Sequence, residues 1–578
     1  MGGRCGMKKN SKKARYLIYF IIIWAVQMAA AFYFCTQKAG FHEDEYYTYY
    51  STARTAGFYV EDGKWMDAET YRNEFVVLPG QQFQYGLVRQ VQSWDVHPPV
   101  YYWIFHTAAS WVPGVFSKWI GLWINLFFHG INIIILTYLS YFAGGRNEKL
   151  AFMATLFYGL TPAAISGVVF IRMYELLTMF VLLCAILHVQ EIRRLQSQID
   201  KQAGQYIENV HMKPQGNGSG TAVEKNRQET GKLSFIKFLL PLMVVTYLGF
   251  LTQYYYFIFL FYMAIAFCVF LLWRDKSLWN CLRYGISQLA AFGLAYLTYP
   301  SCLGQMFRGQ RGAQATENFF DLSNTVMRFR FFLDLLDVYV FGKLLAGFLL
   351  VVIGLILFVY FRRSKGQLLQ QDRAVPWWPM GILCFAAAGY FLTVSKTALL
   401  LGDTSNRYQM PVYGMIVLQL FWAIYSMWVH CVPHRNWSVY LAAAALVICL
   451  ALDAAGLMSG RVVFLYPEDQ EQTAFAKRQE QAGTPVVYLY NEGADWCIWD
   501  VANELMEYSG VYFASAGNDN LIADAVIANT PALVLYLADG ADVQAQIDRI
   551  LGSNKNLTGY ELLYEEKYCD VYYFYSGN

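Results

Sequence analysis

Three carboxylates follow one histidine directly after the first long apolar run of the chain, in the order His42-Glu43-Asp44-Glu45. A charged flank at the end of a membrane span is the ordinary interpretation, but one snorkelling lysine would serve that purpose. A carboxylate at the membrane surface can also take a proton from an attacking hydroxyl or amine, or hold a metal ion that polarises it. We therefore predict that this acidic patch supplies a catalytic carboxylate.

A second polar pair precedes an aromatic run in residues 94–102, which read WDVHPPVYY. The proline at 98 favours extended backbone at His97, so Asp95 and His97 should point to the same side of the chain. The proline at 99 can begin a helix. A helix start with an interfacial aromatic belt is the alternative interpretation. Because an acidic loop lies nearby in the sequence, we predict that Asp95 and His97 take part in catalysis.

Five cations stand near the ends of apolar runs, on the side of the membrane to which the acids are also assigned below. An arginine in such a place can bind a phosphate through two parallel hydrogen bonds. A lipid phosphate has a buried tail and an anionic head at the interface, which matches this pattern of charges. An ion pair between Arg172 and Glu175, three residues apart, is the alternative for the first cation. The predicted phosphate-binding residues are Arg172, Arg308, Arg311, Lys396 and Arg407.

Several tyrosines accompany these charges. Tyrosines at such positions more often belong to the aromatic belt of a membrane protein than to a binding groove. Where they adjoin the predicted acids and cations, they could line a groove for donor or acceptor. The predicted groove residues are Tyr101, Tyr102, Tyr174, Tyr255 and Tyr408.

The elements that must position these side chains are membrane spans. Of the 578 residues, 56% are hydrophobic and 15% are charged, whereas soluble chains carry about 25% charged residues. Uncharged apolar runs of roughly 20 residues recur, and each is long enough to cross about 30 Å of hydrocarbon. We predict a polytopic α-helical membrane protein with about eleven spans, near 16–35, 116–142, 150–169, 173–190, 236–253, 255–273, 284–300, 337–361, 377–394, 408–430 and 437–457.

The distribution of charge predicts the orientation. Residues 1–15 contain six Lys or Arg and no acid, so this basic tail should remain in the cytoplasm, and the loops that are then cytoplasmic all contain Lys or Arg. The protein is therefore expected in the plasma membrane with its C-terminus outside. Nucleic acid is not an expected partner, because the basic residues flank spans instead of forming a basic domain.

Four further segments complete the predicted organisation. The transmembrane domain covers 16–460 and includes a large outer loop at 36–115, a flexible cytoplasmic linker at 193–235 and an outer loop at 301–335. From residue 461 to 578 the chain has 18 Asp+Glu against 6 Lys+Arg. Buried-strand patterns alternate there with helical ones, which predicts a small extracytoplasmic α/β domain.

The order of these motifs resembles the glycosyltransferase C superfamily over roughly residues 16–430. It is closest to the bacterial branch related to protein O-mannosyltransferases and lipid A aminoarabinose transferases. That family often has Glu-Ala before its Arg-Met-Tyr, whereas Phe170-Ile171 stands there in this chain. The motifs are Asp44-Glu45, Asp95-x-His97-Pro98-Pro99-x-Tyr101-Tyr102, Arg172-Met173-Tyr174 and Arg407-Tyr408.

The resemblance implies an inverting sugar transfer from a polyprenyl-phosphate donor to an extracytoplasmic acceptor, which would be a cell-envelope glycan, a lipid or a protein. Asp44 would be the base, with Glu45 supporting it. Asp95 and His97 would orient the acceptor or assist the base, and the arginines would hold the donor phosphate. The transfer could be metal-independent or assisted by a divalent metal ion, since His97 with nearby carboxylates is compatible with such a site.

Two other functions compete with the transferase interpretation. A transporter or flippase of a lipid-linked glycan is expected to have internal repeats and charged or broken helices near the midplane, whereas this sequence shows no repeat and places its charges at span ends. A non-catalytic scaffold that binds a partner through its C-terminal domain would leave the acidic loop and the outer cations without a purpose.

Overall fold

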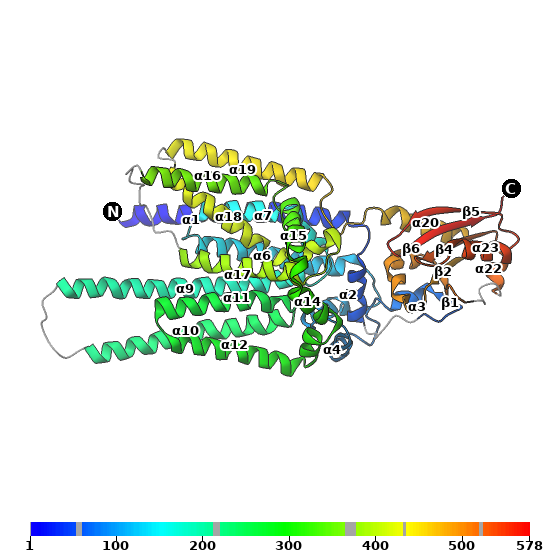
Figure 1. Ribbon diagram of the computed structural model, residues 1–578, viewed down its shortest axis with the longest axis horizontal. Helices are drawn as coiled ribbons and strands as arrows, with labels where there is room; N and C mark the ends of the chain where they lie inside the picture. Colours follow the sequence, from blue (N-terminus) through cyan, green and yellow to red (C-terminus); the bar gives the residue numbers. More distant parts are fainter. Residues whose placement is uncertain are drawn as a thin grey trace.

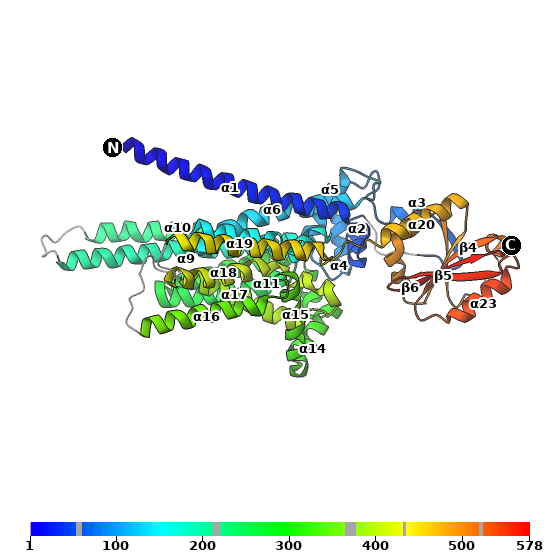
Figure 2. The same ribbon diagram turned by 90° about the horizontal axis from the view of Figure 1, so that it is seen from above.

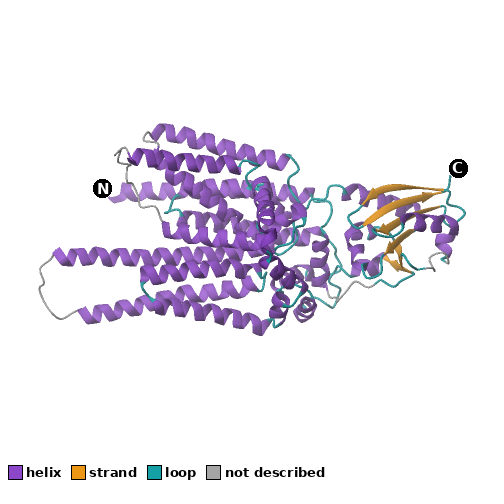
Figure 3. Ribbon diagram, in the orientation of Figure 1, coloured by secondary structure: helices purple, strands orange, loops and turns teal. Residues whose placement is uncertain are grey.

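The structure is a computed structural model that describes residues 2–53, 60–211, 220–364, 377–431, 435–518 and 524–577. Long helices run side by side in a bundle, and a small domain with a β-sheet lies at one end of it (Figure 1). The strands are confined to that end (Figure 3). The amino-terminal end of the first helix lies at the opposite end of the bundle from the sheet (Figures 1 and 2).

Seven helices in the described part of the chain are long and apolar enough to cross a membrane, or eight if one bent pair is counted as a span. Multiple spans agree with the prediction, but the predicted number of about eleven is not reached. Helices α10 (Gly220–Phe250), α12 (Leu278–Thr298) and α19 (Arg435–Met458) occupy the other predicted spans without belonging to the seven. The seven lie in α1 (Gly2–Gln37), α6 (Lys118–Ala143), α9 (Tyr174–His211), α11 (Tyr255–Phe270), α16 (Leu345–Ser364), α17 (Trp377–Thr397) and α18 (Met410–Cys431).

The predicted span at 150–169 is two helices, α7 (Glu148–Gly159) and α8 (Pro162–Val169), which meet at 59°. The side chain of Thr161 accepts a hydrogen bond from the amide of Ala164, and Pro162 is the first residue of α8. A threonine cap followed by proline starts a new helix and leaves no continuous hydrogen-bond ladder across the junction. The sequence pattern is apolar on both sides, so hydropathy alone does not reveal this bend.

Two other predicted boundaries are corrected. The span predicted from 337 begins at Leu345, because α15 (Thr325–Tyr339) is a separate helix that ends before a turn in which Gly342 and Lys343 have φ of 62° and 71°. The predicted flexible linker at 193–235 is helical wherever it is described, since α9 and α10 extend into it. Its Gln, Lys, Glu and Ala residues are good helix formers. Residues 212–219 lie outside the described residues.

The two segments predicted as outer loops contain short helices, and the first also contains a strand. Figure 2 shows α14 projecting sideways from the bundle. The elements of the first loop are α2 (Glu43–Ala53), β1 (Lys64–Asp67), α3 (Ala68–Asn73), α4 (Tyr85–Trp94) and α5 (Val100–Ser110). Those of the second loop are α13 (Ser301–Phe307), α14 (Gln310–Phe320) and the 3₁₀ helix η2 (Leu322–Asn324), which precedes α15. The π-helical turn η1 (Leu271–Asp275) ends α11, and η3 (Gly402–Tyr408) precedes α18.

The C-terminal domain contains one six-stranded sheet with the order β1-β3-β2-β4-β6-β5. The central strands β3, β2 and β4 are parallel, and β2 is buried along its whole length. The predicted small α/β domain is therefore present. The strands are β2 (Val486–Tyr490), β3 (Gly510–Ser515), β4 (Ala532–Ala538), β5 (Gly559–Glu565) and β6 (Cys569–Tyr575). The helices are α20 (Asp469–Ala482), η4 (Asp495–Val501), α21 (Ala502–Leu505), α22 (Ala525–Asn529) and α23 (Val543–Ser553).

The first outer loop supplies one edge of this sheet. Strand β1 pairs antiparallel with β3, far away in the sequence. The guanidinium of Arg72 donates to the carbonyl of Met506 at 3.1 Å. The ring of Trp499 lies 4.5 Å from that of Tyr47 and 4.7 Å from that of Tyr50, both on α2. Helix α2, which carries the predicted acids, is thus packed directly against the C-terminal domain.

Carboxyl groups with raised pKa values lie near this contact. Burial raises the pKa of Glu504 to about 7 and that of Asp469 to about 7. Burial, together with Glu504 and other acids nearby, raises the pKa of Glu566 to about 8. The hydroxyls of Tyr536 and Tyr564 donate to Glu504 Oε2 at 2.7 and 2.6 Å. These acids hold protons that the unfolded chain would release at neutral pH.

We expect the C-terminal domain to melt at a lower temperature at about pH 8 than at about pH 5. A carboxyl whose folded pKa is raised stabilises the domain fully below its unfolded pKa, and that stability is lost as the pH rises toward the folded pKa. The shift of the Glu504 pKa from 4.5 to about 7 corresponds to about 3 kcal/mol of folding free energy.

The variant Glu504→Gln keeps an acceptor for the two tyrosines and should reduce this pH dependence, measured as the melting temperature of the full chain in detergent. Glu492→Gln, an exposed acid of the same domain, is the control. An unchanged pH dependence in Glu504→Gln contradicts this account.

Candidate active site

The first turn of α2 holds Asp44 in place through a reciprocal cap. The amide of His42 donates to Glu45 Oε2 at 2.6 Å, and the amide of Asp44 donates to His42 Nδ1 at 3.1 Å. An acid at the third helical position that binds back to the residue before the helix is a capping-box arrangement. Burial lowers the pKa of His42 to about 3. The imidazole is therefore neutral, and its Nδ1 lone pair is free to accept the Asp44 amide.

Glu45 is fully buried, with none of its surface exposed. Its carboxylate accepts from Lys38 Nζ at 2.9 Å and from the amide of Ile171 at 2.6 Å, in addition to the His42 amide. Lys38 also donates to the carbonyl of Phe464 at 2.7 Å. Because both carboxylate oxygens of Glu45 accept hydrogen bonds inside the protein, Glu45 links α2 to the turn before α9. The structure places it as a positioning residue beneath Asp44.

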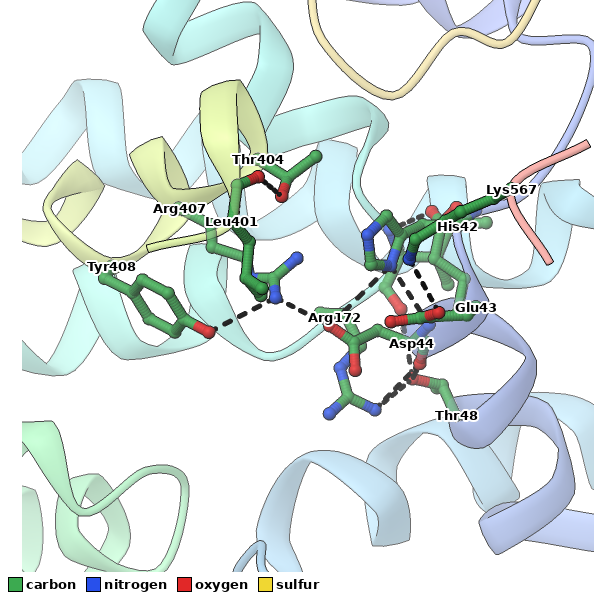
Figure 4. Close-up of polar contacts among 12 residues, drawn as sticks. His42, Glu43, Asp44, Thr48, Arg172, Leu401, Thr404, Arg407, Tyr408 and Lys567 are labelled. Carbon is green, nitrogen blue, oxygen red and sulfur yellow. Dashed lines mark hydrogen bonds and ion pairs between the residues drawn. The ribbon is translucent and has the colours of Figure 1, made fainter. Parts of the chain in front are cut away.

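The Asp44 carboxylate lies between two arginines (Figure 4). Its Oδ2 is 3.0 Å from Arg407 Nη2, and its backbone carbonyl accepts from Arg172 Nη1 at 2.9 Å. Burial raises the pKa of Asp44, but the opposing charges of Arg407 and Arg172 outweigh it, and the net pKa is below its usual value. Asp44 is thus ionised, and its side chain remains 26% exposed while that of Arg407 is only 3% exposed.

Arg172 connects the two predicted acidic motifs. It donates to Thr48 Oγ1 at 3.1 Å, and its Nη2 lies 3.3 Å from Nε2 of His97. Nδ1 of His97 is 3.3 Å from Asp95 Oδ2. If the imidazole carries its proton on Nδ1, it donates to Asp95 and accepts from Arg172. Burial raises the pKa of Asp95, but the charges of His97 and Arg172 more than offset it, so this pKa is also lowered. Asp44, Arg172, His97 and Asp95 therefore form one hydrogen-bonded network.

The turn at residues 170–172 is held by a polar residue inside a span. Asn125 of α6 donates to the carbonyl of Phe170 at 2.6 Å and to that of Val168 at 3.1 Å. The predicted groove residue Tyr101 is fully buried and donates to Asn125 Oδ1 at 3.4 Å. Tyr101 thus supports this turn from inside the protein. Sequence reasoning missed Asn125, although a polar residue in an apolar span was the available signal.

Arg407 is the most unusual cation of the site. Its guanidinium lies 5.3 Å from the ring of Phe170 and 5.0 Å from that of Tyr408. Its Nε and Nη1 are buried and have no hydrogen-bond partner among the described residues. Buried polar atoms are normally satisfied, and an arginine with two unpaired nitrogens is suited to bind an anion such as a carboxylate or a phosphate. Tyr174 and Tyr255 contact the Tyr408 ring edge-on at 6.1 and 5.9 Å.

Tyr102 lies on the other side of the network. It is fully buried, and the guanidinium of Arg172 lies 5.9 Å from the centre of its ring. Its hydroxyl has no hydrogen-bond partner among the described residues. All five predicted groove tyrosines therefore adjoin the arginines or one another, and Tyr101, whose ring lies edge-on 5.9 Å from that of Tyr102, also donates to Asn125.

Three predicted phosphate-binding residues are not brought into this network. Lys396 Nζ donates to the Asp321 carbonyl, Asn324 Oδ1 and Thr325 Oγ1 at 2.6, 2.6 and 3.0 Å, so it holds the start of α15. Arg308 and Arg311 are exposed at α13 and α14.

The alternative ion pair between Arg172 and Glu175 is replaced by another arrangement. Glu175 accepts from Asn132 Nδ2 at 2.7 Å and lies 3.4 Å from His129 Nδ1, both on α6. Arg172 precedes the first turn of α9, so its side chain reaches α2 instead of following the helix surface. This leaves Arg172 available to the network around Asp44.

A divalent metal ion does not fit the side chains that are described. In that part of the chain, no three His, Cys, Asp or Glu side chains gather as ligands for one ion. Asp95 and His97 lie close together, but Arg172 occupies the second ring nitrogen of His97. A cation in that place opposes metal binding, and we derive no step through a metal.

No family model and no curated protein matches this sequence. Among solved structures, the chain is similar to ArnT from Cupriavidus metallidurans bound to undecaprenyl phosphate, with 11% identity, a TM-score of 0.47 and coverage of 96% of this chain and 97% of that one. It is also similar to the archaeal oligosaccharyltransferase AglB from Archaeoglobus fulgidus in complex with an inhibitory peptide and a dolichol-phosphate, with 11% identity, a TM-score of 0.42 and coverage of 96% and 74%. With TM-scores below 0.5, no substrate or activity of this chain is inferred from these likenesses.

Proposed function

We propose that the protein is a membrane glycosyltransferase that moves a sugar from a polyprenyl-phosphate donor to an acceptor at the outer face of the plasma membrane. The observation that carries the proposal is a partly exposed carboxylate, Asp44, beside the nearly fully buried Arg407 with its two unpaired nitrogens. An ionised base candidate therefore lies in direct contact with an arginine that has further hydrogen-bond donors to offer. That is the pairing that transfer from a phosphate-linked donor requires.

The two arginines act on the donor. Arg407 would bind the phosphate through one of its two unpaired nitrogens, and Arg172 would strengthen the positive potential from the other side. Negative charge grows on the phosphate oxygen as the bond to the sugar breaks. Cations held in place before the reaction stabilise that charge without reorganising, which makes them effective in the transition state.

Asp44 acts on the acceptor. The acceptor hydroxyl or amine forms a bond to the anomeric carbon, its proton passes to the Asp44 carboxylate, and the sugar–oxygen bond to the phosphate breaks. The lipid phosphate leaves with the bonding electron pair. In the free enzyme the lowered pKa makes Asp44 a weak base. A bound donor phosphate partly neutralises the charge of Arg407. Arg407 then lowers the pKa of Asp44 less, so Asp44 is a stronger base in the complex with the donor.

The remaining network orients the acceptor side. Asp95 and His97 are 28% and 20% exposed, so they can meet an incoming acceptor, and their link to Arg172 couples acceptor and donor positions. The network lies at the bundle end that faces the C-terminal domain, opposite the basic amino-terminal tail. If that tail is cytoplasmic, the site and the C-terminal domain are extracytoplasmic, where the acceptor would be an envelope glycan, a lipid or a protein.

Reconstituted protein tests this proposal. We expect liposomes that contain the full chain and radiolabelled polyprenyl-phosphate sugars to yield labelled acceptor together with free polyprenyl phosphate. Chromatography separates the two products and shows whether the sugar–phosphate bond has been cleaved. A flippase would instead move the intact labelled lipid between leaflets. Translocation without cleavage, for donors and acceptors of every common class, would exclude the transferase.

A further inference from the structure

A pocket of about 960 Å³ lies at the opposite end of the bundle from Asp44. It is formed by the end of α6, the turn that follows it, and α9. Helix α9 begins at Tyr174, two residues after Arg172, and Arg193 stands about 29 Å farther along this helix at 1.5 Å per residue. That distance is close to the thickness of the hydrocarbon core. The pocket is therefore on the other side of the membrane from the candidate active site.

Three arginines from two segments converge on this pocket. Arg194 is satisfied, because Glu191 accepts from its Nε at 2.7 Å and Gln198 accepts from its Nη1 at 3.2 Å. Among the residues that the structure describes, neither Arg193 nor Arg146 pairs with a carboxylate, and none of the eight that line the pocket is acidic. Arg193 Nε is buried and has no hydrogen-bond partner among the described residues. The charge of Arg146 acts repulsively on Arg193.

The backbone holds Arg146 at this position. Residues 144–146 turn sharply after α6, with Gly145 at φ 82° and Arg146 at φ 63°. A residue other than glycine rarely adopts this left-handed conformation. The Arg146 amide donates to the Tyr141 carbonyl at 2.7 Å, which secures the turn. Two positive charges are thus kept close together, and a bound anion would reduce the repulsion between them.

The surroundings of the pocket are those of a membrane surface. Phe142 lines it, and the ring of Phe142 stacks on that of Tyr138 with centroids 6.2 Å apart. Tyr138 is 56% exposed on the bundle surface. Exposed aromatic rings beside a cluster of arginines are typical of the headgroup level of a bilayer. A ligand with an anionic head and apolar chains would satisfy both features.

We propose that this pocket binds a phosphate group, carried by the headgroup of an anionic phospholipid of the inner leaflet. Arg193 and Arg146 supply the charge-assisted hydrogen bonds, and the glutamines at 190 and 196 provide further polar contacts. Acyl chains would run along the bundle surface past Phe142 and Tyr138. This site is independent of the sugar-transfer proposal, because it shares no residue with the network around Asp44.

Native mass spectrometry of the full chain in detergent tests the site directly. We expect phosphatidylglycerol to remain bound where phosphatidylcholine is lost. Arg146→Gln and Arg193→Gln should each weaken retention about tenfold, and the double variant about a hundredfold, since each removes one charge-assisted contact. Lys149→Gln, an exposed cation close to Arg146 that does not line the pocket, is the matched control and should bind like the wild type.

A third measurement adds inorganic phosphate, in order to distinguish a lipid headgroup from free phosphate as the ligand of the pocket. Retention of phosphatidylglycerol in the presence of phosphate assigns the pocket to a lipid headgroup, whereas displacement by phosphate assigns it to the free anion. Equal retention of phosphatidylglycerol and phosphatidylcholine by the wild type overturns the proposal without recourse to any variant. So does undiminished phosphatidylglycerol binding by a double variant that elutes as a folded monodisperse species.

Discussion

Asparagine in place of Asp44 is expected to lower the rate of sugar transfer by about 10²–10⁴-fold, which is the usual contribution of a general base. Asparagine keeps the shape of the side chain and can still accept a hydrogen bond from Arg407, which lies 3.0 Å from Asp44 Oδ2. It cannot take a proton from the acceptor. Transfer of label from a polyprenyl-phosphate sugar, measured in liposomes at matched protein level, gives the rate.

The same substitution should leave donor binding intact or improve it. Removal of one negative charge beside the phosphate site lessens repulsion, so kcat should fall while KM for the donor stays constant or decreases. Glu43→Gln is the matched control, since Glu43 precedes Asp44 on α2 but points to Lys567 of the C-terminal domain at 2.8 Å. Its activity should stay within a few-fold of the wild type. Normal transfer by Asp44→Asn would remove Asp44 from the role of base.

The second large effect is expected from Arg407→Gln. This variant removes the only guanidinium of the described network that has two unpaired nitrogens, and kcat/KM should fall roughly 10²-fold or more, the scale of a lost transition-state hydrogen bond to a charged group. Because the arginine binds the leaving phosphate, inorganic pyrophosphate or free polyprenyl phosphate should also inhibit the variant less than the wild type. A variant that binds polyprenyl phosphate as tightly as the wild type would contradict this role.

Arg407→Gln should also change the pH dependence of the residual activity. Burial raises the pKa of Asp44, and Arg407 is the largest of the charges that lower it. Without that charge the Asp44 pKa rises, so the acid limb of the kcat/KM profile should move to higher pH. Arg330→Gln, an exposed arginine near Asp334, is the control and should leave the limb in place. An acid limb that does not move would mean that another group controls it.

The C-terminal domain has a structural connection to this chemistry. Helix α2 carries Asp44 and lies between the bundle and Trp499, and Lys567 reaches the helix from the loop before β6. Strand β1 of the first outer loop completes the sheet of that domain. Changes in the domain, including the protonation of its buried acids, therefore reach the site through the position of α2.

Local patterns in the sequence predicted the parts of this protein that depend on local properties. Apolar run length depends only on neighbouring residues, so most spans were located within a few residues of the observed helices. The acids at the start of α2 and the Asp95–His97 pair were also found, because capping and alternation along an extended segment are short-range effects. For Lys396, the charge is visible in the sequence, but the three acceptors that its ammonium group contacts are not.

The sequence by itself determined a multispan helical protein, a C-terminal α/β domain and a set of ionisable residues at span ends. Only the tertiary structure decided which of these meet. Asp44, Asp95, Arg172 and Arg407 come from four distant segments, and their contacts arise from helix packing and from the bend between α7 and α8, neither of which is encoded in residue spacing. Packing also gave the adjacent carboxylates Glu45 and Asp44 different environments. Glu45 is buried and pairs with Lys38, whereas Asp44 is partly exposed and lies beside two arginines.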